Sequence, residues 1–195
     1  FRPSQSDIFH FDFWYKGYNI LRDGGSFSYN TCQENNIYFS GIKSHNTIQF
    51  DDQDPMAKMG NFLWGNWINA EKVVVSSNKS HFFVSASYKL KYGLHKRSIK
   101  MNFGEKIWLI EDFVENKMKF VTLRWRLHPT NWSIKGNELN SSLISMKILS
   151  NDNKAKISLT SGWESIFYNN KEIIPICEFK SFKKNVLFKT IIKLK

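Results

Sequence analysis

Short runs in which apolar and polar residues alternate constrain the fold of this chain more than any other feature. A period of two is typical of a strand that buries one face and exposes the other. Turn-forming Asn, Asp and Gly separate these runs. Many short strands at a spacing of roughly 8–12 residues predict an all-β fold, an antiparallel β-sandwich of many strands with short helical segments. The clearest runs span residues 8–15, 18–22, 81–90, 97–103, 107–114 and 186–193.

Helical patterning is weak along the whole sequence. The best candidate lies around residues 61–69, where Trp64 and Trp67 are three positions apart. We see no internal repeat and no linker, so the sequence predicts one β-sandwich domain, residues 1–195. Because the chain begins with Phe1 rather than Met, we expect it to be part of a longer protein or a mature product.

Composition excludes several classes of protein. Aromatic residues make up 16 % of the chain, which is more than a disordered sequence carries. No run approaches the roughly 18 apolar residues of a membrane span. The net charge of +11 favours a polyanionic partner: nucleic acid, anionic lipid or acidic polysaccharide. Around residues 180–184 and 189–195 the lysines alternate with apolar residues, which is typical of the solvated face of a strand.

General catalytic motifs are absent from the sequence, but two local clusters are candidates. No glycine-rich phosphate loop and no G-x-S-x-G elbow occurs, and Cys32 and Cys177 match no metal spacing. His45 stands in Ser-His-Asn-Thr, where it could bind a metal, titrate near neutral pH or simply lie on the surface. Asp23 precedes two glycines and could be an ordinary turn residue. Arg97, in His-Lys-Arg, could clamp a carboxylate or lie on a solvated edge.

The order of several motifs is more specific than any one of them. Arg-Pro-Ser-Gln-Ser-Asp at 2–7 is followed by Phe-Asp-Phe-Trp at 11–14, Ile-Leu-Arg-Asp-Gly-Gly at 20–25 and His-Asn-Thr at 45–47. His-Lys-Arg at 95–97 and Trp-Arg-Leu-His-Pro at 125–129 come further on. This order resembles the C-terminal β-sandwich domain of the heparinase II/III-like family of polysaccharide lyases.

That resemblance implies an architecture and a reaction. Members of the family carry an α/α toroid upstream of the sandwich, with the active site between the two. They cleave uronic-acid polysaccharides, heparin-like or alginate-like, by β-elimination, and they commonly act in the periplasm or cell envelope. The reaction needs neutralisation of the uronate carboxylate, a base for the C5 proton and an acid for the leaving oxygen. Because the toroid supplies an Asn and a Tyr for this work, we expect the present chain to be inactive alone.

The resemblance also implies a site, with one departure. In several members a His, an Asp and a second His hold a metal, often zinc, and a His at the first position takes part in catalysis. By position, Asp23 and His45 are the expected ligands of zinc or calcium, and the first His falls at Gln5. A glutamine amide does not titrate and is a poor zinc ligand. His10 would lie about 16 Å further along a straight strand, so we do not expect it to replace Gln5 simply.

Two readings of function therefore stay open, and whether the chain is part of an enzyme stays open with them. In the first, the chain is the C-terminal domain of a lyase, and Arg2, Tyr29 and Arg97 line a basic cleft for acidic polysaccharide. In the second, it is a non-catalytic glycan-binding or structural β-sandwich that has lost the catalytic and metal-binding His at Gln5. Binding of nucleic acid by charge alone is a third reading, but the sequence lacks any recognition motif for it.

Overall fold

The structure is a computed structural model that describes residues 3–195, so the predicted role of Arg2 lies outside the described residues. The chain divides into two compact units, each built from three stretches of sequence. Unit 1 comprises Phe1–Ile68, Val121–Pro129 and Ser158–Phe179, and unit 2 comprises Asn69–Phe120, Thr130–Ile157 and Lys180–Lys195. The expected fold class, an all-β antiparallel β-sandwich with short helical segments, is confirmed.

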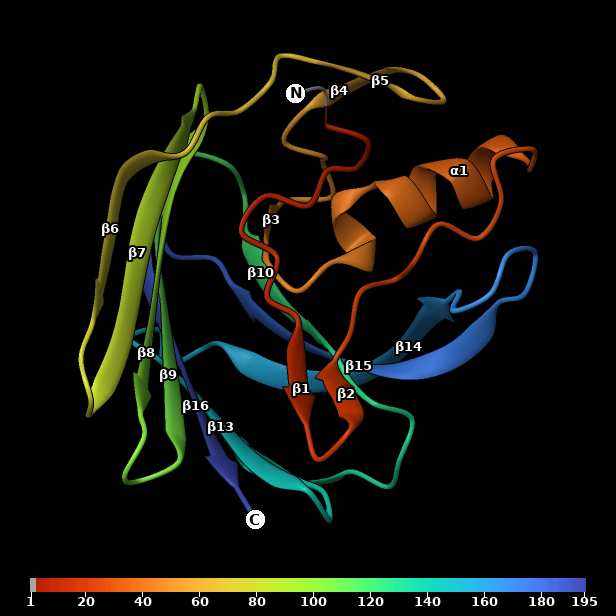
Figure 1. Cartoon of the computed structure of the whole chain (residues 1–195). Coiled ribbons are helices and arrows are strands. Elements are labelled where there is room, and N and C mark those ends of the chain that lie inside the picture. The colour runs from red at the N-terminus through yellow and green to blue at the C-terminus, as the bar shows by residue number, and fades with distance from the viewer. Residues whose placement is uncertain (1–2) are drawn as a thin grey trace. The chain divides into compact units, whose positions relative to one another are not determined.

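Unit 1 holds a four-stranded sheet, two small hairpins and the helical segments (Figure 1). The sheet has the strand order β14-β15-β10-β3, and β1 pairs with β2 as β4 pairs with β5. The elements are β1 (Phe13–Tyr15), β2 (Tyr18–Leu21), α1 (Gln33–Ser40), the 3-10 helix η1 (Ile42–Ser44), β3 (Ile48–Phe50), β4 (Ala57–Gly60), β5 (Leu63–Gly65), β10 (Val121–Arg126), and most of β14 (Lys156–Glu164) and β15 (Glu172–Ser181).

Unit 2 is built on an eight-stranded antiparallel sheet with the order β11-β12-β13-β16-β9-β8-β7-β6. Its long central strands pair over nearly their whole length, and Figure 1 shows them side by side. The strands are β6 (Glu71–Ser77), β7 (His81–Leu90), β8 (Gly93–Asn102), β9 (Ile107–Asn116), β11 (Ser133–Lys135), β12 (Glu138–Asn140), β13 (Ile144–Ser150) and β16 (Asn185–Leu194).

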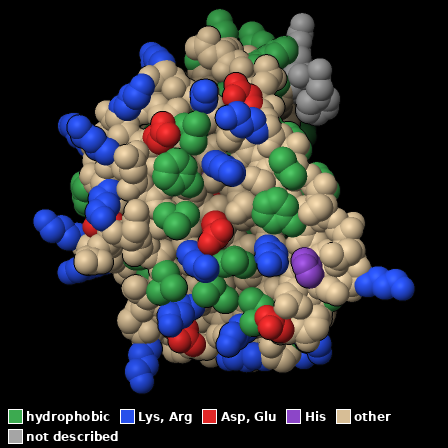
Figure 2. All heavy atoms as spheres, turned by 90° about the vertical axis from the view of Figure 1, so that its left-hand side faces the viewer, with side chains coloured by type: hydrophobic (Ala, Val, Ile, Leu, Met, Phe, Trp, Pro, Cys, Tyr) green, Lys and Arg blue, Asp and Glu red, His purple; other side chains and the backbone are tan. Residues whose placement is uncertain are grey.

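The register of this sheet separates a buried face from an accessible one, as the period of two predicts. Lys96 lies opposite Phe113, which lies opposite Leu187, and all three are exposed. One position along, Arg97 pairs with Asp112, and both are buried. Figure 2 shows basic side chains scattered among hydrophobic and a few acidic ones on the face where β6 and β7 lie. The positive charge is therefore interspersed there and does not form one block.

Two predicted elements were wrong. Residues 61–69 form β5 and its flanking loops, and the helix of unit 1 is α1 at Gln33–Ser40. In α1 the apolar residues Ile37, Tyr38 and Phe39 are consecutive and do not recur at helical spacing, so periodicity could not reveal it. None of the helices in residues 3–195 is long and apolar enough to cross a membrane.

The predicted strand at residues 8–15 was wrong in its first half. The backbone N–H of His10 donates to the carbonyl of Asp7 at 2.8 Å, which closes a turn. Phe9 has a φ of 59°, a left-handed conformation that reverses the chain direction. Only Phe13–Tyr15 form the strand β1. This turn decides where the His10 side chain lies.

Candidate functional site

The Asp-Gly-Gly turn after β2 lets the backbone pass very close to two other segments of unit 1. A Cβ atom on Gly24 would lie 2.5 Å from the Cβ of Ser44, and one on Gly25 would lie 2.0 Å from the carbonyl oxygen of Ser165. Gly25 also has a φ of +75°, which favours glycine. The backbone N–H of Gly25 donates to Oδ1 of Asp23 at 2.6 Å. The two glycines therefore fix the carboxylate of Asp23 beside the segment that carries His45.

Asn46 ties three segments of unit 1 together, and its side chain is fully buried. Its amide nitrogen donates to the carbonyls of Phe11 at 3.0 Å and Arg22 at 3.2 Å. Its Oδ1 accepts the backbone N–H of Arg126 at 2.6 Å. Its own backbone N–H donates to Nδ1 of His10 at 2.9 Å. The His-Asn-Thr motif thus holds His10 in place as well as supplying His45.

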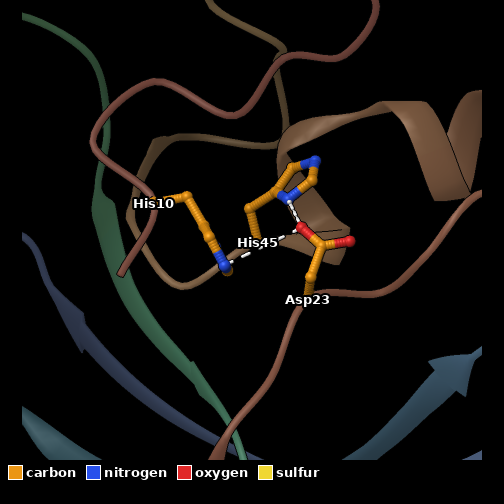
Figure 3. Close-up of side chains that lie close together, drawn as sticks. All are labelled: His10, Asp23 and His45. Atoms are coloured by element: carbon orange, nitrogen blue, oxygen red, sulfur yellow. Dashed lines mark hydrogen bonds and ion pairs between the residues drawn. The ribbon is translucent and has the colours of Figure 1, made fainter. Parts of the chain in front are cut away.

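Three side chains from these segments meet in one cluster, the His10–Asp23–His45 cluster (Figure 3). Oδ2 of Asp23 lies 2.9 Å from Nδ1 of His45 and 3.8 Å from Nε2 of His10. Their ligand-type atoms all lie within 4.8 Å of one another. The sequence argument that kept His10 away from this site was wrong, because it assumed a straight strand where the chain makes a turn at Phe9.

The three side chains differ in their access to solvent. The side chain of His45 is 0 % exposed, that of His10 is 16 % exposed and that of Asp23 is 39 % exposed. Burial would raise the pKa of Asp23, but the hydrogen bond and charge of His45, the charge of His10 and the N–H of Gly25 together bring it below its usual value. Asp23 is therefore a carboxylate at neutral pH.

The hydrogen bonds around His45 settle which ring nitrogen faces Asp23 with a lone pair. The hydroxyl of Ser44 has carbonyl acceptors in Phe39 at 2.8 Å and Gly41 at 2.9 Å, so its single hydrogen is used there. Its oxygen then accepts a hydrogen from Nε2 of His45 at 3.2 Å. A neutral His45 consequently presents a lone pair at Nδ1 to the carboxylate 2.9 Å away. That contact calls for a positive charge between the two atoms, either a proton or a metal ion.

His10 has the opposite arrangement. Its Nδ1 accepts the backbone N–H of Asn46, so the neutral ring carries its hydrogen on Nε2. This is the nitrogen that lies 3.8 Å from Oδ2 of Asp23. A nitrogen that carries a hydrogen has no lone pair for a metal. His10 is placed as a hydrogen-bond and proton donor toward Asp23.

The cluster fits a metal ion only in part. Asp23 and His45 offer a carboxylate oxygen and an imidazole lone pair, which are donors that zinc accepts. Zinc sites in proteins ordinarily use three or four protein ligands. His10 does not supply the third, for the reason given above, and Gln5 has only a neutral amide oxygen. Asp23 and His45 would hold an ion, and the set predicts weak binding.

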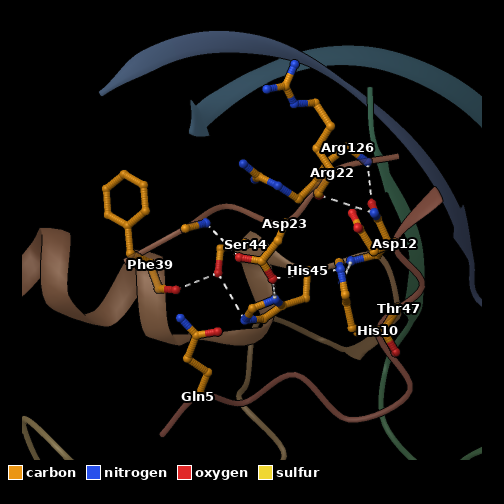
Figure 4. Close-up of polar contacts among 12 residues, drawn as sticks. Gln5, His10, Asp12, Arg22, Asp23, Phe39, Ser44, His45, Thr47 and Arg126 are labelled. Carbon is orange, nitrogen blue, oxygen red and sulfur yellow. Dashed lines mark hydrogen bonds and ion pairs between the residues drawn. The ribbon is translucent and has the colours of Figure 1, made fainter. Parts of the chain in front are cut away.

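The other predicted site residues lie in different surroundings. Gln5 is drawn with the cluster in Figure 4, and its amide nitrogen donates to the hydroxyl of Ser26 at 3.5 Å. Tyr29 is 58 % exposed, in unit 1. Arg97 belongs to unit 2 and is 4 % exposed, with its Nε 2.6 Å from Oδ1 of Asp112. Its guanidinium is committed to that buried carboxylate, which gives Arg97 a structural part in the sheet.

Sequence reasoning missed a buried ion pair next to the cluster. Nε of Arg22 donates to Oε1 of Glu164 at 2.5 Å, and its Nη1 lies 3.0 Å from Nδ1 of His128. Burial raises the pKa of Glu164, although the charge and hydrogen bond of Arg22 oppose the rise. Arg22 and Glu164 are 142 positions apart, so no local pattern could have paired them. The pair fixes β2 just before the turn at Asp23.

Comparison with known proteins identifies the family. The chain matches the family described as Heparinase II/III-like, C-terminal over residues 1–181, and it belongs to that family. Among solved structures, a heparinase III gene product is similar at a TM-score of 0.82 and 17 % identity, over 97 % of this chain and 30 % of that one. Heparan sulfate lyase HepC from Pedobacter heparinus is similar at 0.79 and 20 %, over 97 % and 30 %.

Two further facts bound what these similarities mean. The chain spans about 30 % of the length of both solved proteins, and at these identities the likeness concerns the fold alone. A search of curated protein sequences gave no match.

Proposed function

We propose that this chain is the C-terminal part of a polysaccharide lyase that cleaves uronic-acid-containing polysaccharide, heparin-like or alginate-like, by β-elimination. An upstream α/α toroid would supply the rest of the active site, so the chain is inactive alone. Membership of the heparinase II/III-like family supports the class of protein. The observation that carries the proposal is the His10–Asp23–His45 cluster, which brings a solvent-accessible imidazole to the position where the family motif has become Gln5.

The residues of the cluster have separate tasks in this proposal. His10 is the proton-transferring group, because it is the accessible imidazole of the cluster and its Nε2 carries a hydrogen. Asp23 holds the orientation of His10 and favours its charged form. His45, fully buried, positions Asp23 and does not touch the glycan. Gln5 has no titrating group and acts only through hydrogen bonds.

We extend the proposal to the ion. Asp23 and His45 hold a divalent ion, zinc or calcium, more weakly than a complete ligand set would. Such an ion would supply a positive charge between Oδ2 of Asp23 and Nδ1 of His45, where the hydrogen bonds require one. The proton-transfer task of His10 does not depend on it.

Charge supports an acidic glycan as the partner. The net charge of +11 raises the local concentration of a polyanion, and the cluster belongs to a family whose resemblance implies uronate chemistry. Tyr29 and Arg2 remain the proposed glycan contacts. We place the protein's work in the periplasm or cell envelope, which cell fractionation with an antibody against this chain would check.

The test of the proposed function uses the full-length protein that contains this chain. It is incubated with heparan sulfate, unsulfated glycosaminoglycans and alginate, and the ultraviolet absorbance of the unsaturated uronate product is followed. A steady rise on one of these substrates supports the proposal. No product from any of them overturns it.

One observation favours a second function. Gln5 stands where the family resemblance implies a catalytic and metal-binding His, so this chain could bind glycan without cleaving it. In that case calorimetry would show binding of acidic oligosaccharides, and the same oligosaccharides would be recovered intact after long incubation.

A further inference from the structure

A small polar hollow in unit 1 borders the cluster and is separate from it in composition. Its volume is about 170 Å³. Ser26, three positions after Asp23, lies in its wall, and so does Gln5. The lining residues are hydroxyl-bearing, amide-bearing or aromatic, and none of them is charged: Ser4, Gln5, Ser26, Ser28, Tyr29, Asn36, Ser40, Asn61 and Phe62.

Exposed aromatic rings continue from this hollow as an aromatic row. The ring centroids of Phe62 and Tyr29 are 5.3 Å apart, and those of Tyr29 and Tyr168 are 5.8 Å apart. The three residues are 60 %, 58 % and 59 % exposed, respectively. Large apolar rings at this exposure leave flat faces open to a ligand.

The row is held in place by polar contacts of its own. The hydroxyl of Ser28 donates to the hydroxyl of Tyr168 at 3.2 Å, and the backbone N–H of Tyr29 donates to the same oxygen at 3.3 Å. Ser28 itself is buried and lines the hollow. The aromatic row and the hollow are thus parts of one built surface.

The nearest cation to the hollow is already engaged. The ammonium of Lys58 donates to the hydroxyl of Ser40 and, at 3.1 Å, to the carbonyl of Asn36. It also lies 5.1 Å from the ring centroid of Trp64. Lys58 is not among the residues that line the hollow, so a ligand there meets amides and hydroxyls.

This composition selects against charge. A sulfate or carboxylate that entered the hollow would lose water without gaining a cationic partner, which costs free energy. An uncharged sugar ring instead offers hydroxyls to amides and an apolar face to aromatic rings. The volume is below the roughly 300–1,000 Å³ of pockets that hold whole drug-sized ligands, so it suits a single ring of a chain.

We propose that the hollow and the aromatic row bind an uncharged sugar unit of the glycan whose uronate is handled at the neighbouring cluster. This inference rests on the proposed function and names its substrate class: a polysaccharide in which uronate alternates with a sugar that bears no sulfate. A homopolymer of uronate, or a chain sulfated on its second sugar, fits the surface less well.

Calorimetry with the full-length protein tests this. Three oligosaccharides of equal length are compared: an unsulfated one that alternates uronate with an N-acetylated amino sugar, its counterpart sulfated on the amino sugar, and an oligouronate. We expect the unsulfated alternating chain to bind at least tenfold more tightly than either of the others. Equal binding of all three, or a preference for the sulfated chain, would overturn the inference.

Variants make the test specific to this surface. Asn61→Lys brings a cation to the rim, and we expect it to shift the preference toward the sulfated chain. Tyr29→Ala should weaken binding of the unsulfated chain severalfold, whereas Phe103→Ala, which removes an exposed ring from unit 2, should leave it unchanged. An unchanged preference in Asn61→Lys contradicts the inference. Selective binding without elimination product would leave this inference standing and refute the lyase, and unselective cleavage would do the reverse.

Discussion

Oδ2 of Asp23 and Nδ1 of His45 lie 2.9 Å apart, and the hydrogen bonds around His45 leave that nitrogen with a lone pair in the neutral ring. Two electron-rich atoms at this distance repel each other unless a positive charge lies between them. The same carboxylate oxygen lies 3.8 Å from Nε2 of His10, which carries its own hydrogen. Asp23 therefore has two different histidines as neighbours, one that needs a cation and one that provides a proton.

His10→Gln tests the proton-transfer role. We expect elimination activity of the full-length protein to fall by about 10²–10⁴-fold, the usual contribution of a general acid or base. Gln5→Ala is the matched control, since both changes alter a residue of the same N-terminal segment, and it should cost only a small factor. The assay follows the unsaturated product with pH. Equal losses in the two variants would show that His10 has no special role.

Metal affinity checks the partial ligand set. We expect purified protein to lose zinc or calcium on dialysis, and His45→Ala to abolish what binding remains. Gln5→His restores the ligand type that the family resemblance implies at this position, and it should tighten zinc binding at least tenfold. Equilibrium dialysis with elemental analysis measures both. A wild-type protein that keeps one equivalent of zinc through chelator treatment would contradict the two-ligand assignment.

The cluster shows where sequence reasoning succeeds and where it stops. The resemblance selects Asp23 and His45, and the structure brings the two together. His10 escapes, because one left-handed residue, Phe9, turns the chain, and an alternating pattern is also compatible with an irregular segment. Glu164 escapes because its pairing with Arg22 depends on the fold of the whole unit.

The elements show the same division. The long strands of unit 2 alternate clearly because one of their faces is accessible, and the ranges predicted for β7, β9 and β16 lie close to the observed ones. Strand β10 is buried at every position, so it carries no alternation, and its apolar and arginine side chains had to be read from strand propensity. Helix α1 lacks both periodicity and a side-chain N-cap bond. Only tertiary contacts could define it.

Asn46→Ala should destabilise unit 1 and disorganise the cluster. The change removes three hydrogen bonds to Phe11, Arg22 and Arg126 from a fully buried position. At about 1 kcal/mol each, the free energy of unfolding should fall by about 3 kcal/mol. Urea denaturation measures it, with the exposed Asn153→Ala as control. A loss no larger than that of the control would mean that Asn46 does not hold these segments together.

Asp112→Asn probes the buried network of unit 2. Asp112 is fully buried and accepts hydrogen bonds from Nε and Nη2 of Arg97 and from Nε2 of His95. Removing its charge leaves the guanidinium buried without a counter-charge, which costs about 3–5 kcal/mol. Glu111→Gln is the control, because the neighbouring Glu111 pairs with Lys189 at a partly exposed site, 3.3 Å apart, and such pairs contribute under about 1 kcal/mol. Similar losses in both variants would refute the network's role.

The same network predicts how stability depends on pH. Burial lowers the pKa of His95 from 6.5, against the opposing effect of Asp112, and Nε2–H of the neutral ring donates to that carboxylate. Below about pH 6.5 the unfolded chain takes up a proton at this histidine and the folded chain does not. Acid therefore favours unfolding, and the free energy of unfolding falls by at most about 1.4 kcal/mol per pH unit for this one site.

His95→Gln isolates that contribution. His128, whose pKa is also lowered by burial and by Arg22, acts in the same direction and stays in both proteins. The pKa of Asp112 is lowered from 3.8, because the charge of Arg97 and its bonds to His95 and Arg97 outweigh the effect of burial, so its own contribution is lost only below about that pH. Between pH 5 and 7, urea denaturation should therefore give a shallower fall for His95→Gln than for the wild type. Parallel curves would mean that His95 is protonated in the folded chain, and the neutral tautomer assigned to it here would be wrong.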